Sequence, residues 1–383
     1  ILAQAPHPCH AARRFAAGMA EAALLDGKEV SAVVLDELRA RIQRHQLESH
    51  LHVITVGEDA ASKVFVRQKR QAAERTGVGF SQSSLASDTT LQQLREVILE
   101  KNRDSSVHGI IVQLPLPESL QADERTVLSL VDPAKDVDCF HPLNFGELSL
   151  GEPSFVPATP AGILRLLEHY GIEMKGKCCV ILGKSNIVGK PLALLLAHEA
   201  GPAATVVLCD QHTEGIWDLT RQAHVVVVAT GKHHLLRDPA VLRADGKAVV
   251  VDVGIHRVQS PEGKTVLQGD VDAAAIRPHC RWLTPVPGGV GPMTVACLLE
   301  QVVEAASRLS DESTSVERIL RQSTQASGGH IHRGQLCQLM TRLNPAFPVS
   351  DFDAALGKLS ADRMGRICVD DFVHWAFGTS RKK

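Results

Sequence analysis

The apolar positions of the chain follow two alternating patterns from residue 30 onward. Apolar residues three and four positions apart predict amphipathic helices, and short continuous apolar runs predict buried strands. In the first part of the chain these patterns alternate as helix, strand, helix, helix and strand, over residues 30–45, 51–57, 61–78, 91–106 and 107–117. This order predicts an α/β layer with parallel strands.

A second region of alternating elements begins near Thr159. It is expected to open with a helix and to contain four apolar, mostly valine-rich strands, over residues 177–183, 204–210, 223–231 and 247–254. Strands that are apolar on both faces predict a parallel sheet covered by helices, which indicates a Rossmann-like domain. The helical pattern at 291–309 predicts a long helix that crosses back to the first domain.

A polar linker, SDESTS, separates these regions from two short helix-turn-helix units. The predicted fold class is therefore α/β, with two lobes, an N-terminal α/β lobe and a Rossmann-like parallel-sheet domain, followed by a small all-α module. The predicted boundaries are those of an N-terminal extension and three domains, at 1–21, 22–158, 159–309 and 310–383.

Composition narrows the classes of function. A formal net charge of −2 provides no basic field for nucleic acid, and no apolar run reaches the roughly 18 residues of a membrane helix. Nine cysteines without a CxxC pair argue against a structural zinc site and a disulfide framework. Residues 1–20 contain arginine but no acidic residue, which suggests either the tail of a transit peptide or a frayed N-terminus. We therefore expect a cytoplasmic or mitochondrial matrix protein.

The turn VILGKSNIVGKP is a candidate for binding a dinucleotide. Gly183 ends a predicted strand and lets the chain bend, and Gly189 lets backbone N–H groups approach a phosphate at a helix N-terminus. The spacing departs from the usual GxGxxG, so an ordinary strand-to-helix turn is the alternative. The valine-rich strands on either side favour the dinucleotide interpretation.

The next strand ends in Asp210. An acid at this position usually binds a ribose 2′-hydroxyl and favours NAD, whereas the nearby Lys184 suits the 2′-phosphate of NADP. The residues alone leave this choice open. NADP is the expected coenzyme, with NAD not excluded.

Several motifs together identify a family. They are GKSNIVGKP (183–191), LTPVPGGVGPMTVA (283–296), DVGI (252–255), GDVD (269–272), VQLPLP (112–117) and KDVD (135–138). With these motifs the chain resembles the bifunctional methylenetetrahydrofolate dehydrogenase/methenyltetrahydrofolate cyclohydrolase family, from about residue 22 to 309. The resemblance implies NAD(P)-dependent oxidation of 5,10-methylenetetrahydrofolate, hydrolysis of the methenyl product to 10-formyltetrahydrofolate, a homodimer, and no metal.

The resemblance also assigns site residues. It implies that Lys69 is the catalytic lysine, that Gln113 contacts it, and that Asp138 holds the pterin ring of the folate. The chemistry suits these residue types, because a desolvated lysine has a lowered pKa and manages protons near neutrality. The alternative for Lys69 is a solvated cation on a polar helix face. The expected coenzyme-binding residues are Gly183, Lys184, Ser185, Val188, Gly189, Asp210, Thr230, Gly231, Gly254 and Ile255.

The expected folate-binding residues are Phe65, Pro285, Gly288, Gly289 and Pro292. The family usually has tyrosine where this chain has Phe65, so the ring is kept and the hydroxyl group is lost. We expect an active dehydrogenase with a weakened cyclohydrolase. The alternatives are a monofunctional dehydrogenase and a non-catalytic scaffold that binds folate or nucleotide.

Other polar residues near the expected cleft are interpreted as structural. Asp136 is expected to cap a turn or a helix. His141 and His256 are expected to support the fold, and the family normally has asparagine at the position of His256.

The last region contains two similar segments, GGHIHRGQLCQLM (328–340) and MGRICVDDFVHWAF (364–377), which resemble a degenerate EF-hand pair. If Gly329 and Gly365 occupy the sixth loop position, the first loop has no carboxylate and the second has only two. We expect no calcium binding. The remaining interpretations are a structural helix pair and a module that docks a protein partner.

Overall fold

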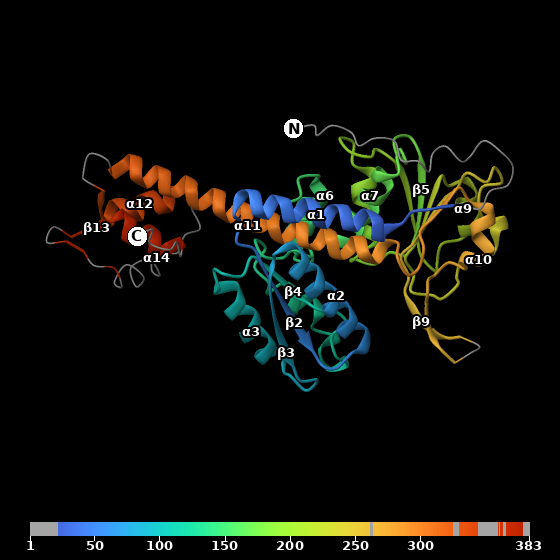
Figure 1. The fold of residues 1–383 in the computed structure, drawn as a ribbon, viewed down its shortest axis with the longest axis horizontal. Coiled ribbons are helices and arrows are strands. Elements are labelled where there is room, and N and C mark those ends of the chain that lie inside the picture. The colour runs from blue at the N-terminus through green and yellow to red at the C-terminus, as the bar shows by residue number, and fades with distance from the viewer. Residues whose placement is uncertain are drawn as a thin grey trace. The chain divides into compact units, whose positions relative to one another are not determined.

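The computed structural model describes residues 22–260, 263–324, 329–343, 359, 361–362 and 365–377. The predicted extension at 1–21 lies outside them. The chain divides into two compact units, Ile1–Ala305 and Ala306–Lys383. Figure 1 shows that the first unit holds two α/β lobes, one around β2 to β4 and one around β5 and its neighbours.

The first lobe is built on a three-stranded parallel sheet of order β3-β2-β4. Its strands are β2 (His50–Val56), β3 (Gly79–Leu85) and β4 (Gly109–Val112). Alternate residues of β2 face opposite sides, so Leu51 and Val53 join one apolar core and Ile54 and Val56 join another. Helix α2 (Ala60–Thr76) buries Val66 in the first core, and α3 (Leu91–Arg103) contributes Leu94 to the second.

Strand β3 was not predicted, because its sequence GFSQSSL carries serines where a buried strand normally has apolar side chains. The serines pair with histidines of β2 instead. The hydroxyl oxygen of Ser81 lies 2.7 Å from Nε2 of His50 and 2.7 Å from Nδ1 of His52, and Ser83 Oγ lies 3.0 Å from Nε2 of His52. Polar pairing therefore replaces apolar packing at this edge of the sheet.

The second lobe contains a six-stranded parallel sheet of order β1-β11-β8-β7-β5-β6, which confirms the predicted Rossmann-like architecture. The strands are β5 (Cys178–Leu182), β6 (Thr205–Cys209), β7 (Val225–Val228), β8 (Val249–Asp252), β11 (Trp282–Leu283) and β1 (Ala23–Leu24). Strands β1 and β11 have two residues each and are too short for the apolar pattern to reveal. Although β1 belongs to the sequence range expected for the first lobe, it pairs with β11 of the second.

Helices surround this sheet and a β-hairpin extends from it. The helices are α7 (Ala158–His169), α8 (Gly189–Ala197), α9 (Ile216–Gln222) and α10 (Ala273–Ile276), with the 3-10 turns η2 (Pro239–Val241) and η3 (Arg277–His279). The hairpin pairs β9 (His256–Gln259) with β10 (Thr265–Gln268). Short helices α4 (Glu118–Gln121), α5 (Glu124–Leu128) and α6 (Pro142–Leu150) lead from the first lobe to the second.

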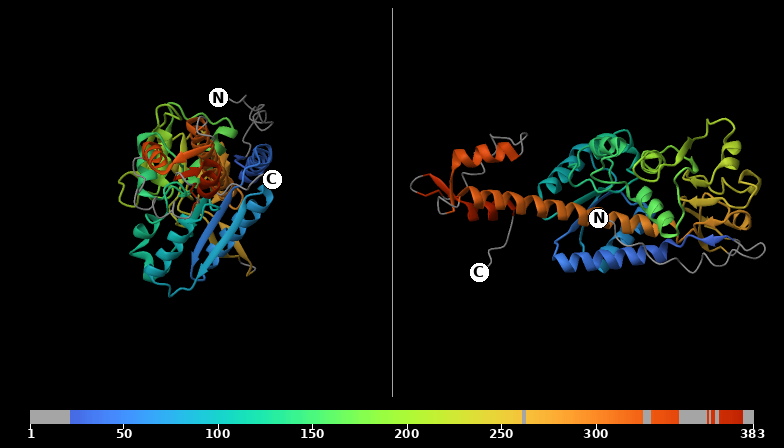
Figure 2. Two further views of the ribbon diagram at one scale, coloured as in Figure 1. Left: turned by 90° about the vertical axis from the view of Figure 1, so that its left-hand side faces the viewer. Right: turned by 90° about the horizontal axis from the view of Figure 1, so that it is seen from above.

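Two helices join the lobes of the first unit. The N-terminal part of α11 (Val290–Thr324) runs beside α1 (Gly27–His45) (Figure 2). A 3.0 Å ion pair between Arg41 and Glu304 links the two helices. A side chain added at Gly109 of β4 would lie 3.0 Å from Val302 of α11, so the helix packs closely against the sheet of the first lobe. Helices α1 and α11 thus hold the two lobes together on one side of the cleft.

The second unit contains α12 (Arg333–Leu343) and α14 (Val369–Phe377), and also a two-stranded antiparallel sheet. The prediction of an all-α module was therefore incomplete. Strands β12 (His330–His332) and β13 (Arg366–Cys368) place Ile331 opposite Ile367, in a small apolar core. None of the helices in the described ranges combines the length and apolar character needed to cross a membrane.

Candidate active site

Lys69 projects from the middle of α2 into a cavity. The helix begins after Asp59, whose carboxylate accepts a 2.6 Å hydrogen bond from the backbone of Ser62, and it ends at Gly77. Only 8% of Lys69 is exposed. Its ammonium Nζ donates a 3.0 Å hydrogen bond to Oε1 of Gln113. The alternative of a solvated surface cation is therefore wrong.

Gln113 lies just beyond the end of β4 and holds a fixed orientation. Its backbone N–H donates to the carbonyl of Ile54, and its side-chain Nε2 donates a 2.7 Å bond to the carbonyl of Leu114. Because the amide nitrogen is occupied in this way, the amide oxygen faces Lys69. Neighbouring parallel strands end at the same edge of the sheet, so the residue after β4 meets the helix that follows β2.

Burial changes the protonation of this group. Desolvation lowers the pKa of Lys69, and the nearby charge of Asp138 partly opposes this shift. Desolvation raises the pKa of the Asp138 carboxyl, the positive charge of Lys69 lowers it, and Asp136 raises it. A buried lysine with a neutral hydrogen-bond partner and one nearby carboxylate exchanges protons more readily than a lysine locked in a salt bridge.

The loop after Lys135 positions Asp138. As predicted, Asp136 caps this loop, because its carboxylate accepts hydrogen bonds from the backbone of Phe140 and His141 and from Nδ2 of Asn144. His141 is also structural, since its Nδ1 accepts from the backbone of Leu143 at the start of α6. These contacts fix the backbone on the C-terminal side of Asp138.

Two cavities in this region share part of their lining, including Phe65. One of about 260 Å³ is lined by Lys69, Gln113 and Asp138 together with apolar side chains. The other, of about 790 Å³, is lined by the remaining predicted folate-binding residues, Pro285, Gly288, Gly289 and Pro292. Phe65 lies one helical turn before Lys69 and borders both cavities. The structure thus places every predicted catalytic and folate-binding residue in the lining of these two adjoining cavities.

The glycine-rich loop at 287–289 closes against α1. Gly288 has φ of +120°, and its carbonyl accepts a hydrogen bond from the backbone of Lys28. A side chain added at Gly27 would lie 1.8 Å from the carbonyl oxygen of Gly289. The close approach of two backbones therefore requires glycine here, and it brings Lys28, which was not predicted, to the wall of the larger cavity.

A third cavity, of about 530 Å³, lies at the carboxyl ends of β5, β6 and β7. It is lined by five predicted coenzyme-binding residues, Gly183, Lys184, Ser185, Asp210 and Thr230. A side chain at Gly189 would lie 1.8 Å from the carbonyl oxygen of Gly183, so the turn packs backbone against backbone. The hydroxyl oxygen of Ser185 accepts hydrogen bonds from the backbone of Val188 and Gly189 at the start of α8. Backbone approach of this kind suits a dinucleotide.

Lys184 and Asp210 form an ion pair at the edge of this cavity, with 3.2 Å between Nζ and Oδ2. The pKa of Asp210 is lowered. The largest cause is a hydrogen bond from the backbone of His212, and Lys184 and Thr213 make smaller contributions. The acid that favours NAD and the base that favours NADP therefore lie in contact.

The other predicted coenzyme-binding residues lie elsewhere. Val188 and Ile255 border the cavity of Lys69, Gly254 borders the larger folate-side cavity, and Gly231 lies next to Thr230.

Two buried aspartates, which were not predicted as site residues, lock these loops together. Asp252 accepts hydrogen bonds from the backbone of Gly254, Asp270 and Val271. Burial raises the pKa of Asp252 to about 7, although the hydrogen bonds from these backbone donors lower it. The motifs DVGI and GDVD contain both residues, but only the fold reveals that they meet.

Within the described residues, no group of three or more His, Cys, Asp or Glu side chains is arranged to hold a metal ion.

Comparison with known families places this geometry in context. The catalytic-domain model of tetrahydrofolate dehydrogenase/cyclohydrolase matches residues 25–138, and the NAD(P)-binding-domain model matches residues 157–310. The Bifunctional protein FolD of Acetivibrio thermocellus is 42% identical over 75% of this chain and 97% of that protein. The protein of the same name from Magnetococcus marinus is 44% identical over 74% of this chain and 97% of that protein.

Solved structures are similar over the same span. The bifunctional FolD methylenetetrahydrofolate dehydrogenase/cyclohydrolase of Campylobacter jejuni is 42% identical, with a TM-score of 0.68, and covers 75% of this chain and 99% of its own. The Trypanosoma brucei enzyme, determined in complex with NADP and an inhibitor, is 34% identical, with a TM-score of 0.70, and covers 76% of this chain and 99% of its own.

Proposed function

Because the chain belongs to the tetrahydrofolate dehydrogenase/cyclohydrolase family, we propose that its single cleft carries out both reactions of that family. The chain is a methylenetetrahydrofolate dehydrogenase and methenyltetrahydrofolate cyclohydrolase. The proposal concerns which residues perform each step. The observation that carries it is the 3.0 Å hydrogen bond from buried Lys69 to Gln113, in a cavity that Asp138 also lines.

In the oxidation, the chain acts by binding and orientation. Asp138 accepts hydrogen bonds from the amino-pyrimidine edge of the pterin, and the ring of Phe65 stacks on the folate between the two cavities. NAD(P), when bound, supplies the nicotinamide that accepts a hydride from the one-carbon bridge and leaves a methenyl cation. Residues around Gly183 and Ser185 hold the coenzyme phosphates through backbone N–H groups.

In the hydrolysis, Lys69 manages the proton of water. Its lowered pKa leaves a fraction of the amine neutral, and this amine accepts a proton as water attacks the methenyl carbon. The attack leaves a hydroxyl group on that carbon. As the bond between the carbon and N5 breaks, the hydroxyl group loses its proton and becomes the formyl C=O. N5 keeps the electron pair of the broken bond and takes up that proton, and 10-formyltetrahydrofolate forms. The uncharged amide of Gln113 orients the amine by a hydrogen bond and does not hold it in a salt bridge.

The test is a paired assay of wild type and Lys69→Met. We expect the loss of methenyltetrahydrofolate to slow at least about a hundredfold, as for removal of a general acid–base group, while the melting temperature is maintained. Lys63→Met is the matched control, because Lys63 lies on the same helix but is exposed. Hydrolysis that survives in Lys69→Met, or falls equally in Lys63→Met, would contradict the assignment.

We propose that the coenzyme of this enzyme is NADP. Lys184 favours NADP by receiving the 2′-phosphate, and its contact with Asp210 offsets the repulsion that the carboxylate alone would exert.

A second candidate is a dehydrogenase with weak cyclohydrolase activity. It is favoured by Phe65, which borders both cavities without a hydroxyl group. Oxidation without hydrolysis in the wild-type protein would support it. The non-catalytic scaffold is set aside, because the chain belongs to a family of enzymes.

We also propose that the enzyme is a homodimer, by analogy with its family, and that the C-terminal module at 310–383 docks a protein partner. The cytoplasmic or mitochondrial location stays a prediction, since the N-terminal segment that bears on it lies outside the described residues.

A further inference from the structure

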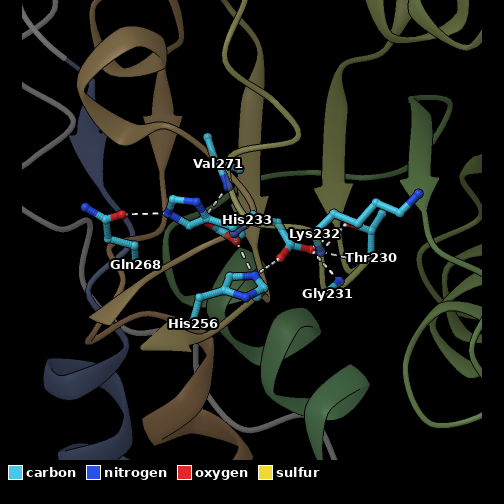
Figure 3. Close-up of polar contacts among 10 residues, drawn as sticks. Thr230, Gly231, Lys232, His233, His256, Gln268 and Val271 are labelled. Carbon is cyan, nitrogen blue, oxygen red and sulfur yellow. Dashed lines mark hydrogen bonds and ion pairs between the residues drawn. The ribbon is translucent and has the colours of Figure 1, made fainter. Parts of the chain in front are cut away.

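The carboxylate of Asp270 joins two loops that belong to different ligand regions. Its side chain is 0% exposed. Oδ2 accepts hydrogen bonds from the backbone of Thr230 at 2.7 Å, from its Oγ1 at 2.9 Å, and from the backbone of Gly231 at 2.9 Å. Oδ1 lies 2.7 Å from Nε2 of His256. Figure 3 shows His256 on one side and Thr230 and Gly231 on the other, with dashed lines marking the polar contacts between them and the residues drawn.

The two loops border different cavities. Thr230 lines the cavity of the dinucleotide turn. His256, together with Gly254 and Ile255, lines the larger cavity on the folate side. Asp270 is therefore a common acceptor for one loop that faces the coenzyme and one loop that faces the folate.

The packing leaves this acceptor little freedom. A side chain at Gly254 would lie 2.0 Å from Oδ1 of Asp270, so the glycine lets the backbone approach the carboxylate. Asp252 holds the backbone of Gly254 and of Asp270 at the same time. The backbone at Gly254 and Asp270 is thus fixed without any contribution from His256. The imidazole of His256 fixes the part of the loop that follows Gly254.

We propose that His256 is a positioning residue for hydride transfer, and that it acts by donating Nε2–H to Asp270 and so setting the folate-side loop at a fixed distance from the coenzyme-side loop. This inference rests on the proposed function. Hydride transfer needs two ligands held in contact, and small misplacements of reacting groups lower the rate steeply. Hydrolysis involves only the folate and water, so it depends on Lys69 and not on the spacing of the two loops.

The neighbours of His256 are consistent with a role through Asp270. The ring of His233 meets the ring of His256 edge-on at 5.5 Å, and His233 itself pairs with Gln268 at 2.6 Å. His234 stacks on His233 and lies 3.9 Å from Asp272. Among these contacts, the 2.7 Å approach to Asp270 is the one that joins His256 to the coenzyme side.

The experiment compares both activities in His256→Leu, His256→Asn and wild type. We expect His256→Leu to lower kcat for oxidation about tenfold or more, with hydrolysis of methenyltetrahydrofolate within about twofold of wild type. An asparagine amide can also donate to a carboxylate, so His256→Asn recovers most of the lost kcat. His279→Leu, an exposed histidine of the same lobe, is the matched control and changes neither rate.

A double-mutant cycle tests the route through Asp270. Thr230→Val removes the Oγ1 donor and keeps the backbone donors, so the protein folds. If both residues act through one carboxylate, the effects of His256→Leu and Thr230→Val on kcat for oxidation are not additive. Strict additivity would overturn the route.

The outcomes separate the inference from the proposed function. Equal losses of oxidation and hydrolysis in His256→Leu, or no loss of oxidation, overturn the inference while leaving the enzyme assignment intact. Absence of both activities in wild type overturns the proposed function, and the inference with it.

Discussion

The two lobes of the first unit each bury ionisable groups, but they treat them differently. In the first lobe, Lys69 gives one hydrogen bond to a neutral amide and faces a cavity. In the second lobe, Asp252 accepts three backbone hydrogen bonds and Asp270 has four partners. A buried charge with few partners is available for chemistry, whereas one with a full set of donors holds the backbone.

Removing the charge should therefore have opposite consequences for stability in the two lobes. Asp252→Asn replaces one carboxylate oxygen with an amide NH2 group, which is a donor that faces a backbone N–H group. We expect it to lower the free energy of unfolding by about 2 to 3 kcal/mol, because a buried donor loses its acceptor. Lys69→Met removes a desolvated ammonium and should leave stability unchanged or raise it. Urea denaturation at pH 8 measures both, and equal destabilisation by the two substitutions would erase the distinction.

The histidines of β2 are a third case, because burial favours their neutral form. Desolvation, aided by Lys101, lowers the pKa of His52 to about 4. The unfolded chain takes up this proton near pH 6.5 and the folded chain only near pH 4. Stability is therefore lost as pH falls through that window.

We expect the contribution of His52 to this loss to be on the order of 2 kcal/mol between pH 7 and pH 4. Denaturation curves of wild type and His52→Gln, recorded at several pH values, isolate it from the neighbouring His50 and His108, whose pKa values are also lowered. Parallel pH profiles of the two proteins would show that His52 titrates normally.

The pair Lys184–Asp210 extends the comparison to solvent, where charges interact weakly. Both side chains are more than a third exposed. Asp210→Ser frees Lys184 to bind the 2′-phosphate of NADP. It also removes a carboxylate whose negative charge repels that phosphate. We therefore expect the ratio of kcat/KM for NADP to that for NAD to rise about tenfold. Asp245→Ser, at an exposed position of the same lobe, is the control. A ratio that stays constant would mean that Asp210 does not face the coenzyme.

Much of the fold was predictable because the apolar patterns are strong. The apolar runs of β5, β7 and β8 identify a buried parallel sheet, and the helix after β2 carries Phe65 and Lys69 one turn apart. Parallel strands also bring the residue after β4 to the same edge of the sheet. The grouping of Lys69 with Gln113 was implied by the family resemblance, and this strand order explains it.

Other features could not be read from the pattern. Strand β3 is held by hydrogen bonds between serine and histidine, and β1 and β11 are too short to show periodicity. The site contribution of Asp270 depends on two loops meeting in space, and no local pattern encodes that meeting. Side chains that act by holding a distant segment leave little signal in their own neighbourhood.

The pairing of β1 with β11 has a consequence for synthesis on the ribosome. The sheet of the first lobe is complete once β4 has emerged, early in translation. The sheet of the second lobe includes Ala23 and Leu24, which emerge before the first lobe, whereas their partners Trp282 and Leu283 emerge only after the rest of that sheet. At the usual rates of translation the N-terminal strand waits many seconds for its partner. We therefore expect nascent chains that stop before β11 to contain a protease-resistant first lobe and an exposed, cleavable N-terminal segment.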